Sequence, residues 1–300
     1  MLKNLFIREN LKWKEVKKMK KLILFAILGI MLSIGTAQAD FWTGSVWNNQ
    51  LGAFVPNVMG LDWSSSGSGN AESWGAPGTA PAVGTDFTFR YQAELVGLTD
   101  AVGDPVDFPG LTSTFEYTVV STFNERLTAL IPLGGGLFSA VFTTLPGGTF
   151  YIYNDGTPNT DVATGVGYDD GSLALSGTIN VGEISVFTLT SASPVEGMGS
   201  TILEGLINFA NTDYFDPAIS IIDFRVEGTI NYPPLDSATE AYFAGRAGEG
   251  NYATFTVGAN DLAFKVDGSS KLSIPEPSTL ILLGTGLIGL GGYARRRMKK

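Results

Sequence analysis

Ile184-Ser185-Val186-Phe187-Thr188-Leu189 alternates apolar and polar side chains, and Asp86-Phe87-Thr88-Phe89-Arg90-Tyr91 does the same earlier in the chain. A period of two places successive side chains on opposite faces of a β-strand. Similar runs cover residues 114–119, 137–142, 149–153, 219–230, 254–257 and 262–266, and Gly, Pro, Asn and Asp separate them. The pattern predicts an all-β body with a β-sandwich or jelly-roll architecture.

Two features modify this strand pattern. Two thirds of residues 62–85 are Gly, Ser, Ala or Pro, which predicts a flexible loop or a linker.

Residues 175–180, 203–208 and 226–231 resemble one another, and each carries a glycine at its third position (Gly177, Gly205 and Gly228). Their unequal spacing argues against a solenoid. We therefore expect similar strands of one sheet, each with a glycine at a bulge or a crowded crossing.

The composition excludes several classes of chemistry. The 300 residues include neither histidine nor cysteine, which removes disulfides, thiolate nucleophiles, the Ser-His-Asp triad and imidazole metal sites. Catalysis would depend on carboxylates, Ser, Lys and Tyr, and no catalytic motif selects among them. We therefore interpret the body as a structural or binding module and predict no enzyme. The alternative is a secreted glycan-active enzyme, which would need two carboxylates roughly 5–10 Å apart in a cleft.

The charge distribution separates the body from the two ends of the chain. Residues 40–274 carry 26 acidic and six scattered basic side chains, a net charge of −20, whereas residues 1–39 and 275–300 are both basic. Binding to nucleic acid requires clustered Lys and Arg. The body is therefore not expected to bind nucleic acid.

The N-terminal residues predict export. Met19-Lys20-Lys21 precedes the apolar stretch 22–34, and Ala37 and Ala39 form an Ala-x-Ala site for signal peptidase. Residues 19–39 therefore have the organisation of a signal peptide that is cleaved after Ala39. The apolar stretch would span only about 20 Å as a helix, less than the thickness of the hydrocarbon core. Residues 1–18 add nothing to this signal, and we interpret them as a start-site extension.

The C-terminal residues predict a single membrane helix. The uncharged stretch 278–294 is followed by Arg295, Arg296, Arg297, Lys299 and Lys300. The stretch is long enough for a short transmembrane helix, and the basic residues would keep its end in the cytoplasm. The preceding Pro275, Glu276 and Pro277 form an extended segment, because neither proline can donate a backbone hydrogen bond.

Residues 275–300 closely resemble the PEP-CTERM sorting signal, through Pro275-Glu276-Pro277, the Leu- and Gly-rich stretch and the terminal basic cluster. Such signals occur on exported proteins of Gram-negative bacteria that make exopolysaccharide. The resemblance implies processing near Pro-Glu-Pro by exosortase, a membrane protease-transpeptidase. It also implies an inner-membrane precursor with its body in the periplasm, which then reaches the cell surface or the extracellular matrix. The resemblance covers the tail only, and the family of the body is not recognised.

Two further hypotheses concern ligands of the body. Trp42, Trp47, Trp63 and Trp74 lie close together in the sequence and could stack on sugar rings or pack the sheet. The acidic turn residues Asn154, Asp155, Asp161, Asp169 and Asp170 could bind Ca²⁺, as in a Ca²⁺-dependent adhesin. Their spacing fits no calcium-binding motif, and Asp and Asn are common in turns for backbone reasons. No cofactor is otherwise predicted.

Overall fold

The alternating sequence forms antiparallel strands whose apolar side chains share one interior. The computed structural model describes residues 40–74, 80–162, 165–192, 195–216, 223–232, 242–243, 255–256 and 261–274. In these ranges all regular structure is strand, and no helix has the length and apolar character that a membrane crossing requires. The strands are β1 (Asp40–Phe41), β2 (Gly44–Asn48), β3 (Ala53–Val58), β4 (Gly60–Glu72), β5 (Asp86–Thr99), β6 (Pro105–Val106), β7 (Glu116–Gly134), β8 (Leu137–Thr144), β9 (Thr149–Asp155), β10 (Ser172–Ile179), β11 (Ile184–Ala192), β12 (Val195–Ala210), β13 (Phe215–Asp216), β14 (Asp223–Tyr232), β15 (Tyr242–Phe243), β16 (Phe255–Thr256) and β17 (Leu262–Ile274).

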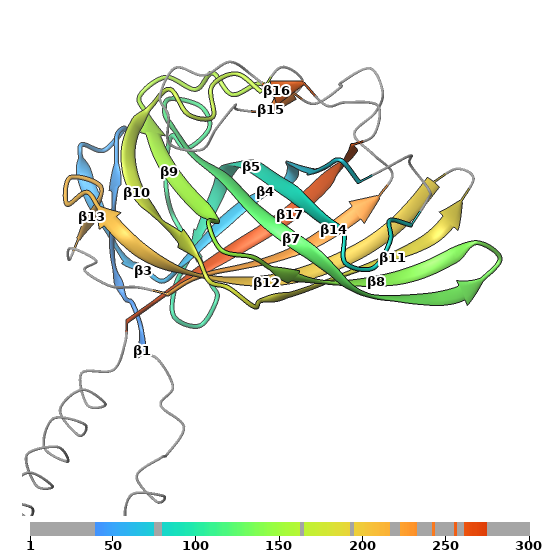
Figure 1. Cartoon of the computed structure of the whole chain (residues 1–300). Coiled ribbons are helices and arrows are strands. Elements are labelled where there is room, and N and C mark those ends of the chain that lie inside the picture. The colour runs from blue at the N-terminus through green and yellow to red at the C-terminus, as the bar shows by residue number, and fades with distance from the viewer. Residues whose placement is uncertain are drawn as a thin grey trace, which may run out of the picture. The chain divides into compact units, whose positions relative to one another are not determined.

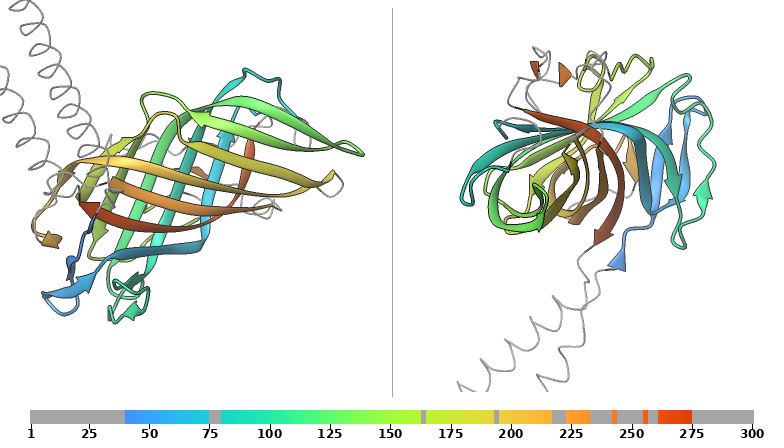
Figure 2. Two further views of the ribbon diagram at one scale, coloured as in Figure 1. Left: turned by 90° about the horizontal axis from the view of Figure 1, so that it is seen from below. Right: turned by 90° about the vertical axis from the view of Figure 1, so that its right-hand side faces the viewer.

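The main sheet closes on itself. Antiparallel pairing runs from β4 through β5, β7, β8, β11, β12, β14 and β17 and returns to β4. Seen end-on, these strands curve around a common interior (Figure 2, right). We call this arrangement the closed sheet. Alternate side chains of its strands β5, β7 and β8 are buried in this interior, which is the arrangement that an alternating sequence requires.

One wall of the closed sheet is shared by two pairs of strands. β7 pairs with β9 through residues 116–122 and with β8 through residues 125–134. On the other edge of this wall, β12 pairs with β11 through residues 195–201 and with β10 through residues 205–210. The β9–β10 and β8–β11 pairs therefore occupy opposite ends of the wall (Figure 1).

The predicted all-β class is confirmed, and the closed topology goes beyond the prediction. A sandwich, a jelly roll and a closed sheet all place alternate residues of each strand inside. Alternation alone cannot distinguish them. The distinguishing observation is the long-range pairing of β17 with β4, because it joins the last long strand to one of the first.

The expectation of a loop over residues 62–85 is wrong for its first half, because residues 62–72 belong to β4. This strand pairs with β5 on one side and β17 on the other. Its small residues make room for large ones: a Cβ added to Gly69 would overlap the buried ring of Phe264. The glycines and serines here accommodate an aromatic core, and composition alone does not separate that role from flexibility.

The three similar segments lie in one sheet, as expected, and the expectation of a bulge or a crowded glycine is confirmed at Gly177 and Gly205, whereas the side chains around Gly228 on its own strand lie outside what the structure describes. They lie in β10, β12 and β14, which are neighbours in the sheet. The β10–β12 register shifts between Ser176 and Gly177, as at a bulge. A Cβ on Gly177 would overlap the carbonyl oxygen of Leu206 and the ring of Phe150, and a Cβ on Gly205 would also meet that ring. Gly177 and Gly205 therefore allow the fully buried Phe150 to lie between two strands.

Candidate functional site

The residues with predicted sorting roles lie outside the described ranges, but their neighbours do not. These residues are Ala37, Ala39, Pro275, Glu276, Pro277, Arg295, Arg296, Arg297, Lys299 and Lys300. β1 begins at Asp40, the first residue after the predicted signal peptide, and β17 ends at Ile274, the residue before Pro275. Asp40 pairs with Ile274, and Phe41 pairs with Ser273. The two predicted processing points are therefore adjacent in sequence to residues that are paired in the fold.

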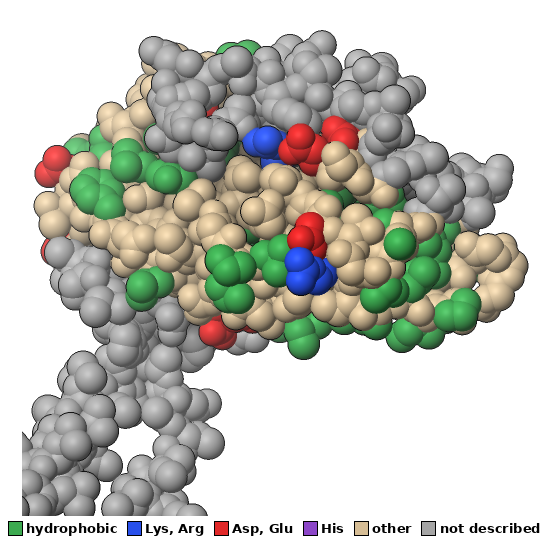
Figure 3. All heavy atoms as spheres, in the orientation of Figure 1, with side chains coloured by type: hydrophobic (Ala, Val, Ile, Leu, Met, Phe, Trp, Pro, Cys, Tyr) green, Lys and Arg blue, Asp and Glu red, His purple; other side chains and the backbone are tan. Residues whose placement is uncertain are grey.

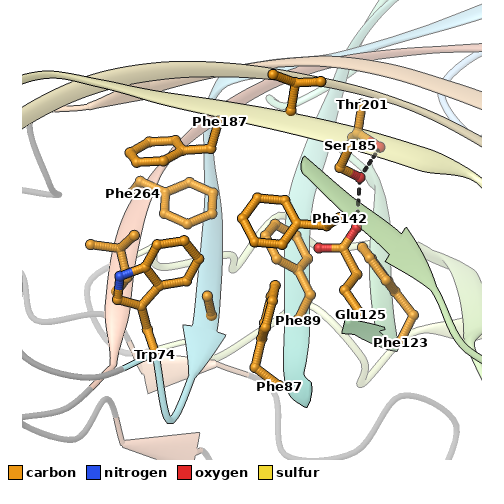
Figure 4. Close-up of a pocket in the computed structure, with 13 residues that line it drawn as sticks. Trp74, Phe87, Phe89, Phe123, Glu125, Phe142, Ser185, Phe187, Thr201 and Phe264 are labelled. Atoms are coloured by element: carbon orange, nitrogen blue, oxygen red, sulfur yellow. Dashed lines mark hydrogen bonds between the residues drawn. The ribbon is translucent and has the colours of Figure 1, made fainter. Parts of the chain in front are cut away.

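A second candidate site is a cavity inside the closed sheet, which we call the interior pocket (Figure 4). The space in which the centre of a water-sized molecule fits is about 30 Å³, and the whole space between the surrounding atoms, part of it open to solvent, is about 410 Å³. Most of its wall is aromatic. The lining residues are Ala71, Trp74, Phe87, Phe89, Phe123, Glu125, Phe142, Ser185, Val186, Phe187, Thr201, Leu262 and Phe264.

Glu125 is the charged residue of this wall. It lies on β7 between the inward-facing Phe123 and Leu127, and only 3% of its surface is exposed. Ser185 donates a hydrogen bond of 2.6 Å from Oγ to Glu125 Oε1, and Ser185 Oγ also lies 2.8 Å from Thr201 Oγ1. The other oxygen of Glu125 points toward the aromatic side chains (Figure 4).

The strand register brings this polar group together. Ser185 on β11 is directly opposite Thr201 on β12, so their hydroxyl groups are cross-strand neighbours. Burial raises the pKa of Glu125 to about 7, and the hydrogen bond from Ser185 offsets part of that rise. Near neutral pH the carboxyl group therefore exchanges a proton readily, within an otherwise apolar enclosure.

We expect Glu125→Gln to stabilise the protein at pH 8 and to have little effect at pH 4.5. The folded-state pKa of about 7 lies above the unfolded value of 4.5, so the folded state binds the proton more tightly. The stabilisation that the protonated carboxyl group contributes is fully present below the pKa that it has in the unfolded chain. This stabilisation is lost as the pH rises toward 7. The gain at pH 8 should be at most about 3 kcal/mol.

The measurement is the difference in unfolding free energy between variant and wild type from pH 4.5 to 8. Taking this difference cancels the contributions of other carboxyl groups. Glutamine can still accept the Ser185 hydrogen bond, so packing is preserved. A difference that does not change with pH would contradict the assignment.

A pair of carboxyl groups, Glu94 and Glu116, lies on the outer face of the sheet. Glu94 on β5 is opposite Thr118 on β7, which places Glu94 diagonally across from Glu116. Burial, and then the charge of Glu116, raise the pKa of Glu94 to about 7. Burial also raises the pKa of Glu116. The hydrogen bonds that Asn159 N and the backbone and hydroxyl of Thr160 donate to Glu116 lower this pKa and offset part of the rise.

This carboxylate pair does not form a glycosidase site. Glu116 has no exposed surface, and its oxygens accept hydrogen bonds from residues 159–160. It therefore anchors a loop and cannot reach a substrate. The interior pocket contains one carboxylate, whereas glycoside hydrolysis generally uses two. Neither location supplies the feature that would favour the enzyme alternative.

Asp155, Asp161 and Asp170 make contacts within the fold, whereas Asp169 Oδ2 is buried without a hydrogen-bond partner among the described residues. Asp155 accepts a hydrogen bond from the backbone of Thr157, Asn159 donates one to Asp170, and Asp161 forms a bridge with Val166. No group of three or more acidic side chains there could hold a metal ion. The structure therefore gives the calcium hypothesis no support from described residues.

The tryptophans mainly pack the interior. Trp42, Trp63 and Trp74 are at most 5% exposed, and Trp63 Nε1 donates a 2.6 Å hydrogen bond to Ser270 Oγ. Trp47 is half-buried and packs edge-to-face against Phe54. Three of the four indoles therefore cannot stack on a sugar at the surface, which corrects the sugar-binding hypothesis for them.

Two basic side chains of the body, Arg90 and Arg126, lie beside carboxylates. Arg90 lies 3.3 Å from Glu72, and Arg126 lies 2.6 Å from Asp86, through atoms Nη2–Oε2 and Nε–Oδ1 respectively. On the face shown in Figure 3, the few blue side chains are next to red ones and most of the surface is uncharged. The described surface in that view presents no cluster of basic residues of the kind that phosphate groups require.

The sequence reasoning did not select Glu125 or Ser185. One signal was available: Phe123, Glu125 and Leu127 have the same parity in an alternating strand, so a carboxylate occupies a core position. The partner Ser185 lies 60 residues away and could be found only from the strand register.

The comparisons with known proteins concern the tail. No curated protein and no solved structure matches the chain. A family model described as the PEP-CTERM protein-sorting motif matches residues 273–297, which include the Pro-Glu-Pro segment and the arginines after the apolar stretch. The chain carries a PEP-CTERM sorting motif. The first two residues of the matched motif, Ser273 and Ile274, are also the last two residues of β17.

Proposed function

We propose that the protein is an exosortase substrate whose all-β body is delivered outside the cell as a structural or binding module associated with exopolysaccharide. The motif supports export through a C-terminal sorting signal and a membrane-anchored precursor. The cell-surface or matrix destination, the exopolysaccharide and the Gram-negative host are the proposed parts.

One observation carries this proposal. The closed sheet is complete at Ile274, and Pro275-Glu276-Pro277 follows immediately. Processing at or after that segment would leave every described strand and every described residue of the interior in place. The body can therefore leave the membrane as a folded unit, which is what a delivered module requires.

The experiment compares two hosts that both carry exosortase, one producing exopolysaccharide and one lacking it. In the producing host, the mature chain should fractionate with the polymer, and its mass should correspond to a start at Asp40 and an end near Pro277. In the polymer-deficient host, the same processed chain should appear in the medium. An identical distribution in both hosts would contradict the exopolysaccharide association, and an unprocessed chain in both would contradict the sorting.

Deletion of residues 1–18 should leave export unchanged, because Met19 begins a signal with a basic start, an apolar stretch and an Ala-x-Ala site. The measurement is the N-terminal sequence and the yield of the exported chain. A matched control changes Ala37 and Ala39 to larger residues in the same truncated chain, which should block cleavage. Retention of the truncated chain in the cytoplasm, or a mature N-terminus other than Asp40, would show that the signal has been misplaced.

A further inference from the structure

The interior pocket combines a buried carboxylate with a set of aromatic rings. The ring centroid of Trp74 lies 5.7 Å from that of Phe87, 5.6 Å from that of Phe142 and 5.9 Å from that of Phe187. Phe87 and Phe142 are 5.3 Å apart and nearly perpendicular. Edge-to-face packing of this kind turns rings in different directions, so the wall presents both edges and faces to the enclosed space.

Among the described residues, the carboxylate of Glu125 has no cationic partner. Its one hydrogen bond there comes from Ser185, and the ion pairs Arg90–Glu72 and Arg126–Asp86 do not involve it. Apart from Glu125, the lining residues carry no titratable side chain. A buried carboxylate is stabilised by a positive charge nearby, and the faces of aromatic rings also attract cations. The chemistry of the wall therefore complements a cation with an apolar surface.

The size of the cavity limits that cation. The centre of a water-sized molecule can move through only about 30 Å³, so the cavity holds a ligand of a few heavy atoms, and a long or branched one would have to displace rings. Methylammonium and dimethylammonium carry a charge, an N–H donor for the free oxygen of Glu125, and methyl groups for the rings. An inorganic cation of similar charge lacks the methyl groups, and a neutral molecule of similar size lacks the charge.

We propose that the interior pocket binds a small alkylammonium cation, with Glu125 pairing with its N–H group and Trp74, Phe87 and Phe142 surrounding its methyl groups. Ser185 is a positioning residue, because its hydroxyl holds one carboxylate oxygen and directs the other into the pocket. This proposal does not depend on how the protein is sorted.

The test uses the full chain in a non-ionic detergent at pH 8, with dimethylammonium chloride as the probe and potassium chloride at equal ionic strength as the reference. Dimethylammonium should raise the melting temperature in a saturable way, because a ligand of the native state stabilises it. Dimethyl ether, which is neutral and similar in size, should have no saturable effect. An equal effect of potassium or of the ether would overturn the proposal.

Glu125→Gln should weaken dimethylammonium binding at least tenfold in isothermal titration calorimetry. Glu94→Gln is the matched control, because Glu94 is another carboxyl group with a raised pKa but lies outside the pocket. It should bind like the wild type. Circular dichroism checks that each variant is folded.

A second readout keeps the proposal testable if Glu125→Gln does not fold. At pH 7, binding to the wild type should release protons, because the cation favours the charged carboxylate. The apparent binding enthalpy should then depend on the ionisation enthalpy of the buffer. Binding that is unchanged in Glu125→Gln, or that releases no protons in the wild type, would exclude Glu125 as the binding group.

Discussion

In a host that carries exosortase, the Pro275→Ala, Glu276→Ala, Pro277→Ala triple variant is expected to accumulate in the inner membrane with its C-terminal segment attached. The wild-type chain should lose roughly 20 residues from that end, judged from the length of the apolar stretch. The substitutions leave residues 278–294 intact, so membrane insertion should be unaffected. They remove two prolines and the carboxylate between them, which are features of the matched motif near the body. Mass spectrometry of the membrane and surface fractions measures the result.

A contrasting variant separates recognition from anchoring. Neutral residues in place of Arg295, Arg296, Arg297, Lys299 and Lys300 should weaken the expected cytoplasmic anchor, because positive charges set the orientation of a membrane helix. That chain should slip through the membrane, whereas the triple-alanine chain should remain in it. If the triple-alanine chain is trimmed as efficiently as the wild type, the segment is an anchor alone and the sorting interpretation fails.

Gly177→Ala is expected to destabilise the sheet strongly, with a decrease in unfolding free energy of about 3 kcal/mol. The added methyl group would overlap the backbone carbonyl of Leu206 and the ring of Phe150. A side chain could rotate away, but the carbonyl is part of the β10–β12 pairing and cannot move without breaking it. The melting temperature should fall by roughly 6–12 °C.

Gly97→Ala is the matched control for this loss. Gly97 lies on β5, and a Cβ there would meet Asp62 at an ordinary distance of 3.5 Å. Neither glycine has a positive φ, so both substitutions test space and not backbone conformation. Gly97→Ala should change the unfolding free energy by less than about 1 kcal/mol. Equal effects at the two positions, measured by denaturant unfolding, would show that the crowding at Phe150 is not rigid.

The sequence predicted the type of structure better than its closure. Period-two alternation depends on neighbouring residues, so it identified the strands around Phe87 and Phe187. Closure depends on which distant strands pair, such as β17 with β4, and no local pattern encodes that choice. The misassigned residues 62–72 show the same limit. Gly69 leaves space for the ring of Phe264, which lies almost 200 residues away in the sequence.

The two candidate sites differ in how far the sequence could reveal them. The sorting motif is linear, so Pro275 and its neighbours were recognisable without a structure. The interior pocket is assembled from seven strands or their ends, and its polar group joins residues of β7, β11 and β12. The one local signal for this pocket was that Glu125 occupies a position of the alternating strand that faces the core, between Phe123 and Leu127. Burial, which raises the pKa of this group to about 7, is a property of the assembled interior and not of the local sequence.

The place of β17 in the closed sheet has a mechanical consequence for an anchored precursor. The tether leaves from Ile274, at the end of a strand that pairs with β14 on one side and β4 on the other along most of its length. A pull along β17 would load these pairs together in shear, since antiparallel hydrogen bonds lie perpendicular to the strand. They could not be peeled apart one at a time. Forced unfolding is governed by the unfolding rate, so a body held at this strand should resist drag from flowing liquid better than one held at the two-residue β1.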